Sequence, residues 1–442
     1  MEIKLSDHFT YGRLFKFVLP SVVMMVFTSI YGVVDGFFVS NFVGKIPFAA
    51  LNLIMPFLMI IATIGFMMGT GGSAIVAKAL GEGKNDKANA YFSLIVYFLI
   101  AIGLVITVIS YIFMPYVARL LKADAEMMDH CILYGRIVTL GLVFFMLQNL
   151  FQSFMVTAQK PKLGLLITVA AGVTNMVLDF LFTAVFRFGI AGAAAATALS
   201  QVVGGGLGLV YFIRKNSSLL RLTKPEMNGK VLLKTCTNGS SELMTNVSLS
   251  LVNILYNTQL MNIIGKDGVA AYGVIMYVAF IFVSIFIGYS IGVAPVIGFN
   301  YGRDNREELR NMKNKSFVLI TVSGILLTVA AIAMSPVLSK IFVGYDRELF
   351  ELTEHAFSIY SYSFFFAGFG IFGSAFFTAL NDGLVSAIIS FLRTLVFQVF
   401  CVLALPVFFG IDGIWGAVVL AEILSMIVAL IFIAANRKKY GY

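Results

Sequence analysis

The chain has 442 residues, of which 60% are hydrophobic and 12% are charged, whereas about 25% of the residues of an ordinary soluble domain are charged. This composition excludes a soluble globular protein. The odd number of cysteines, without metal-ligand or CxxC spacing, excludes a disulfide scaffold and argues against a structural zinc site. The first apolar run extends beyond signal-peptide length and no cleavage motif follows it, so we expect it to be retained as a membrane span.

Long segments with few charges recur along the whole chain. A transmembrane helix needs about 20 apolar residues, and continuous runs rich in Phe, Leu and Ile exclude the alternating pattern of a membrane β-barrel. We therefore predict an all-α polytopic membrane protein with twelve transmembrane helices. In chain order the expected spans are 16–39, 46–78, 91–114, 132–158, 162–186, 188–213, 233–261, 268–299, 316–340, 354–381, 383–409 and 411–436.

Basic residues concentrate in two segments between these spans, 214–234 and 303–315. Cytoplasmic loops of membrane proteins carry an excess of Lys and Arg, so this distribution predicts that both termini are cytoplasmic. The formal net charge of +9 is then a consequence of topology. Because these charges flank apolar runs and no soluble domain presents them, we expect no nucleic-acid partner.

The two halves of the sequence are related by a constant offset of 221 residues. Gly71 and Gly81 align with Gly292 and Gly302, and identities continue across the loops. Each half contains six spans and so enters and leaves the membrane on the same side, which makes the repeat parallel. We predict an N-terminal six-helix lobe at 1–213, a basic cytoplasmic linker at 214–230 and a C-terminal six-helix lobe at 231–442. Transporters of this design bind substrate between the repeats and work by alternating access.

Three local patterns then point to a family. They are Gly69-Thr70-Gly71-Gly72 with Leu80-Gly81-Glu82-Gly83 at the end of the second span, Ala294-Pro295 with Asn300-Tyr301-Gly302 at the end of the eighth, and Asn175-x-x-x-Asp179 in the fifth. With twelve spans in two lobes, this order resembles the multidrug and toxic compound extrusion (MATE) family. The resemblance covers almost the whole chain.

The resemblance implies secondary active efflux, in which H⁺ or Na⁺ moves inward in exchange for organic, often cationic, compounds. It implies a multi-pass protein of the prokaryotic plasma (inner) membrane that needs no cofactor besides the coupling ion. We expect a monomer whose partners are small organic molecules and the lipid bilayer. The sequence contains neither GxxxxGK[ST] nor HExxH, so we expect no ATP hydrolysis and no enzyme activity. Two alternatives stand beside this reading: a lipid-linked oligosaccharide flippase of the same superfamily, and a membrane receptor that does not transport.

Two acidic residues lie inside spans of the first half, Asp35 in span 1 and Asp179 in span 5. An Asp in the middle of a transmembrane helix costs at least about 2.5 kcal/mol, which makes each one a candidate functional residue. Asn175 shares a helix face with Asp179, and Thr197 falls at a similar depth in span 6. Carboxylate, amide and hydroxyl oxygens are suited either to a proton or to a small cation such as Na⁺.

The family resemblance assigns these four residues a role. In the prokaryotic DinF-like members, which the N-terminal lobe is similar to, an Asp on span 1, an Asn and an Asp on span 5 and a Thr on span 6 form the cation site. Asp35, Asn175, Asp179 and Thr197 match those places. The offset of 221 puts Tyr256, Val396, Phe400 and Val418 at the corresponding second-half positions, so this acidic site is expected in one lobe alone.

The second half carries three isolated charges within spans, Glu242, Arg393 and Glu422. Glu242 and Arg393 fall at a similar depth, and we expect them to form an ion pair. In the alternative interpretation, Glu242 or Glu422 contacts a cationic drug or provides a second protonation site. His355, at the external start of span 10, is expected to be an interface residue.

Aromatic and methionine residues are abundant, and their polarizable side chains suit a cavity that accepts many flat cations. We predict a substrate cavity lined by Tyr31, Met55, Gln148, Gln152, Glu242, Met276, Tyr277 and Arg393. Pro20 interrupts the first span and is expected to allow that helix to bend, since proline removes a backbone hydrogen bond.

Overall fold

The structure is a computed structural model that describes residues 3–442. The first half consists of α1 (Tyr11–Phe38), α2 (Lys45–Gly81), α3 (Asn85–Leu120), α4 (Ala125–Leu140), α5 (Leu142–Thr157), α6 (Pro161–Asp179) and α7 (Gly189–Ile213). The second half consists of α8 (Gly229–Ile263), α9 (Lys266–Gly302), α10 (Arg306–Val343), α11 (Arg347–Ser361), α12 (Ser363–Ala379), α13 (Gly383–Phe391), α14 (Phe397–Ala435) and α15 (Arg437–Tyr440). Three π-helical segments continue these helices: η1 (Val39–Val43), η2 (Phe180–Val185) and η3 (Leu392–Val396).

These elements form the twelve predicted spans. Eight continuous segments are long and apolar enough to cross a membrane, and two bent pairs, α4 with α5 (56°) and α11 with α12 (45°), each form one more span. The segment Gly383–Ala435 contains two spans, because Gly410 breaks it with φ 58° and ψ −132°. The helix α8, with 35 residues, is the remaining span and is more polar than the others. The predicted all-α fold class is confirmed.

The repeat is visible in the geometry of the backbone. The helices α2 and α9 each contain 37 residues and begin and end at positions related by the offset of 221. Gly44 and Gly265 precede them with φ of 117° and 93°, and Gly189 and Gly410 have φ of 62° and 58°. Glycine adopts positive φ at little cost, so equivalent glycines produce the same chain reversals in both halves.

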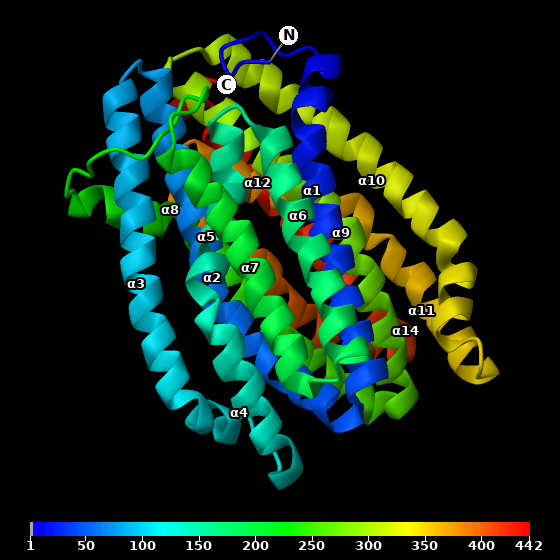
Figure 1. Ribbon diagram of the computed structural model, residues 1–442. Helices are drawn as coiled ribbons and strands as arrows, with labels where there is room; N and C mark the ends of the chain where they lie inside the picture. Colours follow the sequence, from blue (N-terminus) through cyan, green and yellow to red (C-terminus); the bar gives the residue numbers. More distant parts are fainter. Residues whose placement is uncertain (1–2) are drawn as a thin grey trace.

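Close helix contacts join the two halves at the end of the bundle where both termini lie (Figure 1). We call this the terminal end. A Cβ atom added to Gly81 would collide with the carbonyl oxygen of Phe299, and one added to Gly302 would collide with that of Lys78. A Cβ on Gly239 would likewise meet the backbone of Met67. Glycine allows backbones to approach this closely in membrane proteins, so the terminal end is closed.

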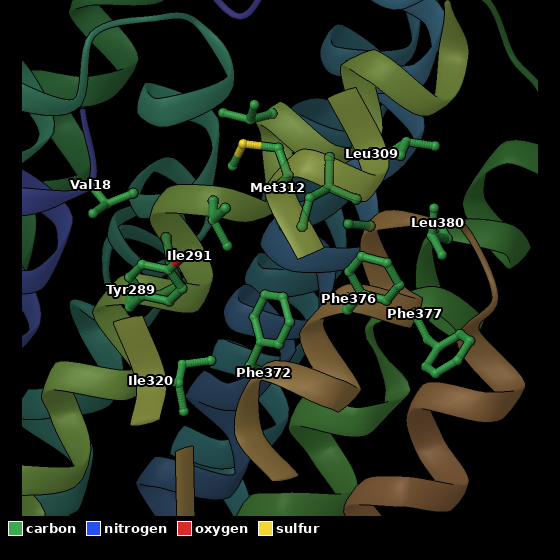
Figure 2. Close-up of a cluster of buried hydrophobic side chains, with 14 of the residues drawn as sticks. Val18, Tyr289, Ile291, Leu309, Met312, Ile320, Phe372, Phe376, Phe377 and Leu380 are labelled. Atoms are coloured by element: carbon green, nitrogen blue, oxygen red, sulfur yellow. The ribbon is translucent and has the colours of Figure 1, made fainter. Parts of the chain in front are cut away.

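A large apolar cluster fills the terminal-end half of the second lobe. Figure 2 shows Tyr289 and Ile291 of α9, Met312 of α10 and Phe372 of α12 converging there, with Val18 of α1 reaching in from the first half. Leu5 and Phe9, which precede α1, are fully buried in the same cluster. The N-terminal segment therefore packs against the second lobe.

Candidate functional site: a buried acid pair and a polar cavity

The structure brings together the acids predicted from the first half. Asp35 lies near the end of α1, and Asn175 and Asp179 lie one turn apart near the end of α6; all three are buried. The Asp35 carboxyl interacts with the side chains of both Asn175 and Asp179. Oδ1 of Asp35 and both carboxyl oxygens of Asp179 accept no hydrogen bond from any described residue. Two neighbouring buried carboxyls with free oxygens favour a shared proton or a bound cation.

Thr197 of α7 lies at the edge of this acid pair rather than directly on it. Its hydroxyl donates to the carbonyl of Ala193 (3.1 Å) and also contacts the hydroxyl of Tyr134. Tyr134 of α4 is fully buried and lies within electrostatic range of both Asp35 and Asp179. Tyr31 and Gln148, predicted as substrate residues, contact each other beside Asp35.

Tyr134 is a site residue that the sequence analysis missed. The internal repeat offered a signal, since the offset of 221 aligns Tyr134 with His355, another titratable side chain. His355 itself lies away from this site and hydrogen-bonds Oδ1 of Asp412 through Nε2 (2.8 Å), with both side chains exposed.

All three π-helical segments lie next to charged residues inside the membrane. The segment η1 follows the turn that carries Asp35, η2 begins directly after Asp179, and η3 contains Arg393. Thr183 of η2 donates its hydroxyl to the carbonyl oxygen of Asp179 (2.6 Å). Such π-helical turns are frequent at functional sites because they reorient side chains within a helix.

A second region that contains charged side chains is a cavity of about 230 Å³ in the C-terminal lobe, bounded on the other side by α2 and α5. Of the predicted substrate residues, Glu242, Met276 and Arg393 line it. Tyr31 and Gln148 belong to the acid pair instead. Gln152 is buried outside this lining, and Met55 packs against an apolar cluster of the first half. Tyr277 is 48% exposed on the outer surface.

The charged residues of the cavity pair differently from the expectation. Arg393 binds Glu422 in a bidentate ion pair, with Nε donating to Oε2 and Nη2 to Oε1, both at 2.9 Å. The predicted ion pair between Glu242 and Arg393 is therefore wrong, because α14 rather than α8 presents the carboxylate to η3. Among the described residues Glu242 has no ion-pair partner. The charges of Glu242, Arg393 and Glu422 together give the cavity lining a formal charge of minus one.

Aromatic and amide groups complete the cavity. Tyr256 and Tyr272 stack with ring centroids 4.9 Å apart and an angle of 8°, and the hydroxyl of Tyr272 donates to Asn253 Oδ1 (2.9 Å). Tyr256 Oη and Gln398 Oε1 have no hydrogen-bond partner among the described residues, although both are buried and both side chains line the cavity. Buried polar atoms without partners are unfavourable, so these atoms favour a polar ligand.

Two six-helix repeats that surround a polar intramembrane cavity define a membrane transporter fold. The MatE family model matches residues 20–181 and 243–403, one stretch in each half. The chain belongs to the MatE family, as the resemblance predicted.

Curated relatives and solved structures agree with this assignment. The chain is 22% identical to the multidrug export protein MepA of Staphylococcus haemolyticus (strain JCSC1435) over 438 residues, which cover 98% of this chain and 96% of the relative. It superimposes on an outward-facing multidrug resistance MATE transporter with a TM-score of 0.92, 21% identity and coverage of 98% and 97%. A MATE structure in the bent conformation gives a TM-score of 0.89, with 21% identity and coverage of 99% and 98%. These relatives are transporters, in line with the prediction that the chain is not an enzyme.

Proposed function

We propose that this protein is a secondary active multidrug exporter that exchanges H⁺ or Na⁺ for organic compounds by alternating access. The observation that carries the proposal is the buried pair Asp35 and Asp179, whose free oxygens have no donor among the described residues. Multidrug export by the MepA relatives supports the substrate class. The two carboxyls support coupling to a cation, which is either a proton or Na⁺.

The coupling cation occupies the space between Asp35 and Asp179 in this proposal. A proton shared by the two carboxyls, or a Na⁺ ion held by them with Asn175, removes the repulsion between like charges. Thr197 and Tyr134 orient the site from α7 and α4. Loss of the cation restores the repulsion between α1 and α6, which gives the lobe two states whose balance depends on the bound ion.

The substrate binds in the cavity of the C-terminal lobe. A lining with a formal charge of minus one attracts an organic cation, and the unpaired Glu242 is its counter-ion. The stacked rings of Tyr256 and Tyr272 offer an aromatic surface to the apolar part of the drug. Arg393 is neutralised by Glu422, so the cavity lacks the basic character that binding of a lipid-linked pyrophosphate requires. This charge balance favours the exporter over the flippase.

The orientation of the protein in the membrane follows from its basic loops, which we expect to be cytoplasmic. With both termini in the cytoplasm of a prokaryotic cell, the glycine contacts at Gly81 and Gly302 close the cytoplasmic end of a monomer in the plasma membrane. The cavity is then reached from the outside, which is the state that releases a drug and accepts a coupling cation. Inward opening requires these helices to separate.

Efflux from proteoliposomes tests the proposal. Export of a fluorescent organic cation is measured with a Na⁺ gradient and a pH gradient imposed separately. We expect one of the two to drive efflux in the wild type, and Asp179→Asn to reduce the driven rate at least tenfold. Asp129→Asn is the matched control, because Asp129 is an exposed acid on α4. Equal efflux with neither gradient, or wild-type efflux in Asp179→Asn, contradicts coupling through this pair.

A further inference from the structure

A groove on the outside of the first lobe has features that neither the acid pair nor the drug cavity explains. It lies between α6 and α7 at the terminal end and is open to the surroundings of the protein. Its lining follows helical spacing on both sides: Leu163, Leu166 and Ile167 on α6, and Leu207, Val210 and Tyr211 on α7. Residues three and four apart share a helix face, so the two helices present facing apolar stripes.

These stripes face the surroundings of the protein rather than its core. Leu166 is 64% exposed, and Leu207 and Val210 are also exposed. Within a membrane-spanning segment, such side chains contact lipid acyl chains. The groove is therefore open to a hydrocarbon chain, which would contact just over one helical turn on each side.

Two basic residues close the groove where α7 ends. Arg214 and Lys215 follow Ile213 directly and line the groove beside Asn216 and Ser217. Both basic side chains are exposed, and neither forms an ion pair with any described residue. Asn216 holds this turn in place, since its Nδ2 donates to the carbonyl of Tyr211 (3.2 Å) and its Oδ1 accepts from the backbone N–H of Ser218 (3.0 Å).

The linker is also fixed on its far side, which keeps the basic turn next to the groove. The backbone N–H of Arg221 donates to Asn89 Oδ1 (2.8 Å), and that of Thr223 donates to the Ser93 hydroxyl (2.8 Å). Both acceptors lie on α3. Two free cations thus stand at the rim of an apolar groove, at the depth where a span meets the polar boundary of the bilayer.

We propose that this groove binds an anionic phospholipid, with its phosphate between Arg214 and Lys215 and an acyl chain along Leu166, Leu207 and Val210. Basic pockets between transmembrane helices are suited to acidic lipid headgroups. At the corresponding positions the second repeat has Ala435 and Asn436, and its basic residues begin at Arg437. The inference does not depend on the transported substrate or the coupling ion.

Lipid binding to the purified full-length protein tests the inference. Native mass spectrometry and thermal unfolding are recorded with phosphatidylglycerol, with phosphatidylcholine and with glycerol 3-phosphate as the soluble headgroup. We expect phosphatidylglycerol to give the highest occupancy and the largest stabilisation. The double variant Arg214→Ala/Lys215→Asn, which installs the residues of the second repeat, is expected to bind it roughly 25-fold more weakly, about fivefold for each charge.

Two further variants separate the site from general charge effects. Arg437→Ala/Lys438→Ala removes two exposed basic residues that follow α14 and is expected to leave binding unchanged. Val210→Trp fills the groove without altering charge and is expected to lower phosphatidylglycerol occupancy, which keeps the test informative if the double variant misfolds. Equal binding of phosphatidylcholine, equal stabilisation by glycerol 3-phosphate, or an equal loss in Arg437→Ala/Lys438→Ala would overturn the proposal.

Discussion

Gly81 and Gly302 occupy equivalent positions in the two repeats, and each packs against the backbone of the other's helix, Gly81 on Phe299 and Gly302 on Lys78. This reciprocal contact between α2 and α9 lies near the pseudo-twofold axis that relates the lobes. It leaves no room for a side chain on either helix, so the closed terminal end depends on two residues without a Cβ.

We expect Gly302→Ala to loosen the terminal end. The added methyl group collides with the carbonyl of Lys78, and overpacking of this kind costs about 1–3 kcal/mol. Apparent melting temperature in detergent measures the effect. Gly273→Ala is the control on the same helix, since nothing lies within 4 Å of its Cβ position; it should be neutral or stabilising by up to about 1 kcal/mol. Equal stability of the two variants would show that the contact is not tight.

Removing one partner of the ion pair in the cavity should destabilise the second lobe. The side chains of Arg393 and Glu422 are 14% and 7% exposed, so Glu422→Gln leaves a largely buried guanidinium without its counter-charge, which costs about 3 kcal/mol. The double variant Arg393→Met/Glu422→Met should recover most of that loss. Thermal unfolding of the wild type, Arg393→Met, Glu422→Met and the double variant gives the coupling energy, and additive losses would contradict a direct pair.

Tyr134→Phe should weaken cation binding without unfolding the first lobe. The change deletes a buried hydroxyl that contacts Thr197 beside the acid pair, and the ring remains to fill its space. We expect the concentration of coupling cation needed for half-maximal efflux to change severalfold. Tyr116→Phe is the control, because Tyr116 is 63% exposed at the lipid-facing end of α3. Unchanged cation dependence in Tyr134→Phe would remove this residue from the site.

The contact of the C-terminal residues Lys439 and Tyr440 with Asp382 should weaken in acid. Burial acts to raise the pKa of Asp382, but hydrogen bonds from Lys439, Tyr440 and the backbone N–H of Val385 outweigh it, so the pKa lies below its usual range. A lowered folded-state pKa gives stability that is present above the unfolded-state pKa of about 3.9 and is lost as the pH falls through the folded value. The gain stays below about 1 kcal/mol because Lys439 is exposed.

Melting curves between pH 3 and pH 7 measure this effect. In Asp382→Asn the melting temperature should fall less steeply towards low pH than in the wild type, while Asp129→Asn should show the wild-type fall. A wild-type fall in Asp382→Asn would assign the acid sensitivity to other groups.

The sequence predicts most of this fold and part of its sites. The lengths of the apolar runs predict the spans, and the offset of 221 predicts equivalent turns such as those at Gly189 and Gly410. Spans and turns can be predicted in this way because they depend on local sequence. The proximity of Asp35 and Asp179 follows from depth and the family pattern. The partner of Arg393 does not, since depth along a helix gives neither the face that a side chain occupies nor the neighbouring helix. For the same reason Tyr277, next to Met276 in sequence, points away from the cavity.

The N-terminal segment has a consequence for how the molecule is made. Glu308 of α10 is buried; its Oε1 accepts from the backbone N–H of Phe9 (3.0 Å) and its Oε2 hydrogen-bonds His8 Nδ1 (2.7 Å). Lys315 donates to the carbonyl of Phe9 (2.6 Å). The segment before α1 therefore reaches its binding place only after α10 has been synthesised. Membrane insertion of the first lobe can therefore precede the anchoring of this segment to α10.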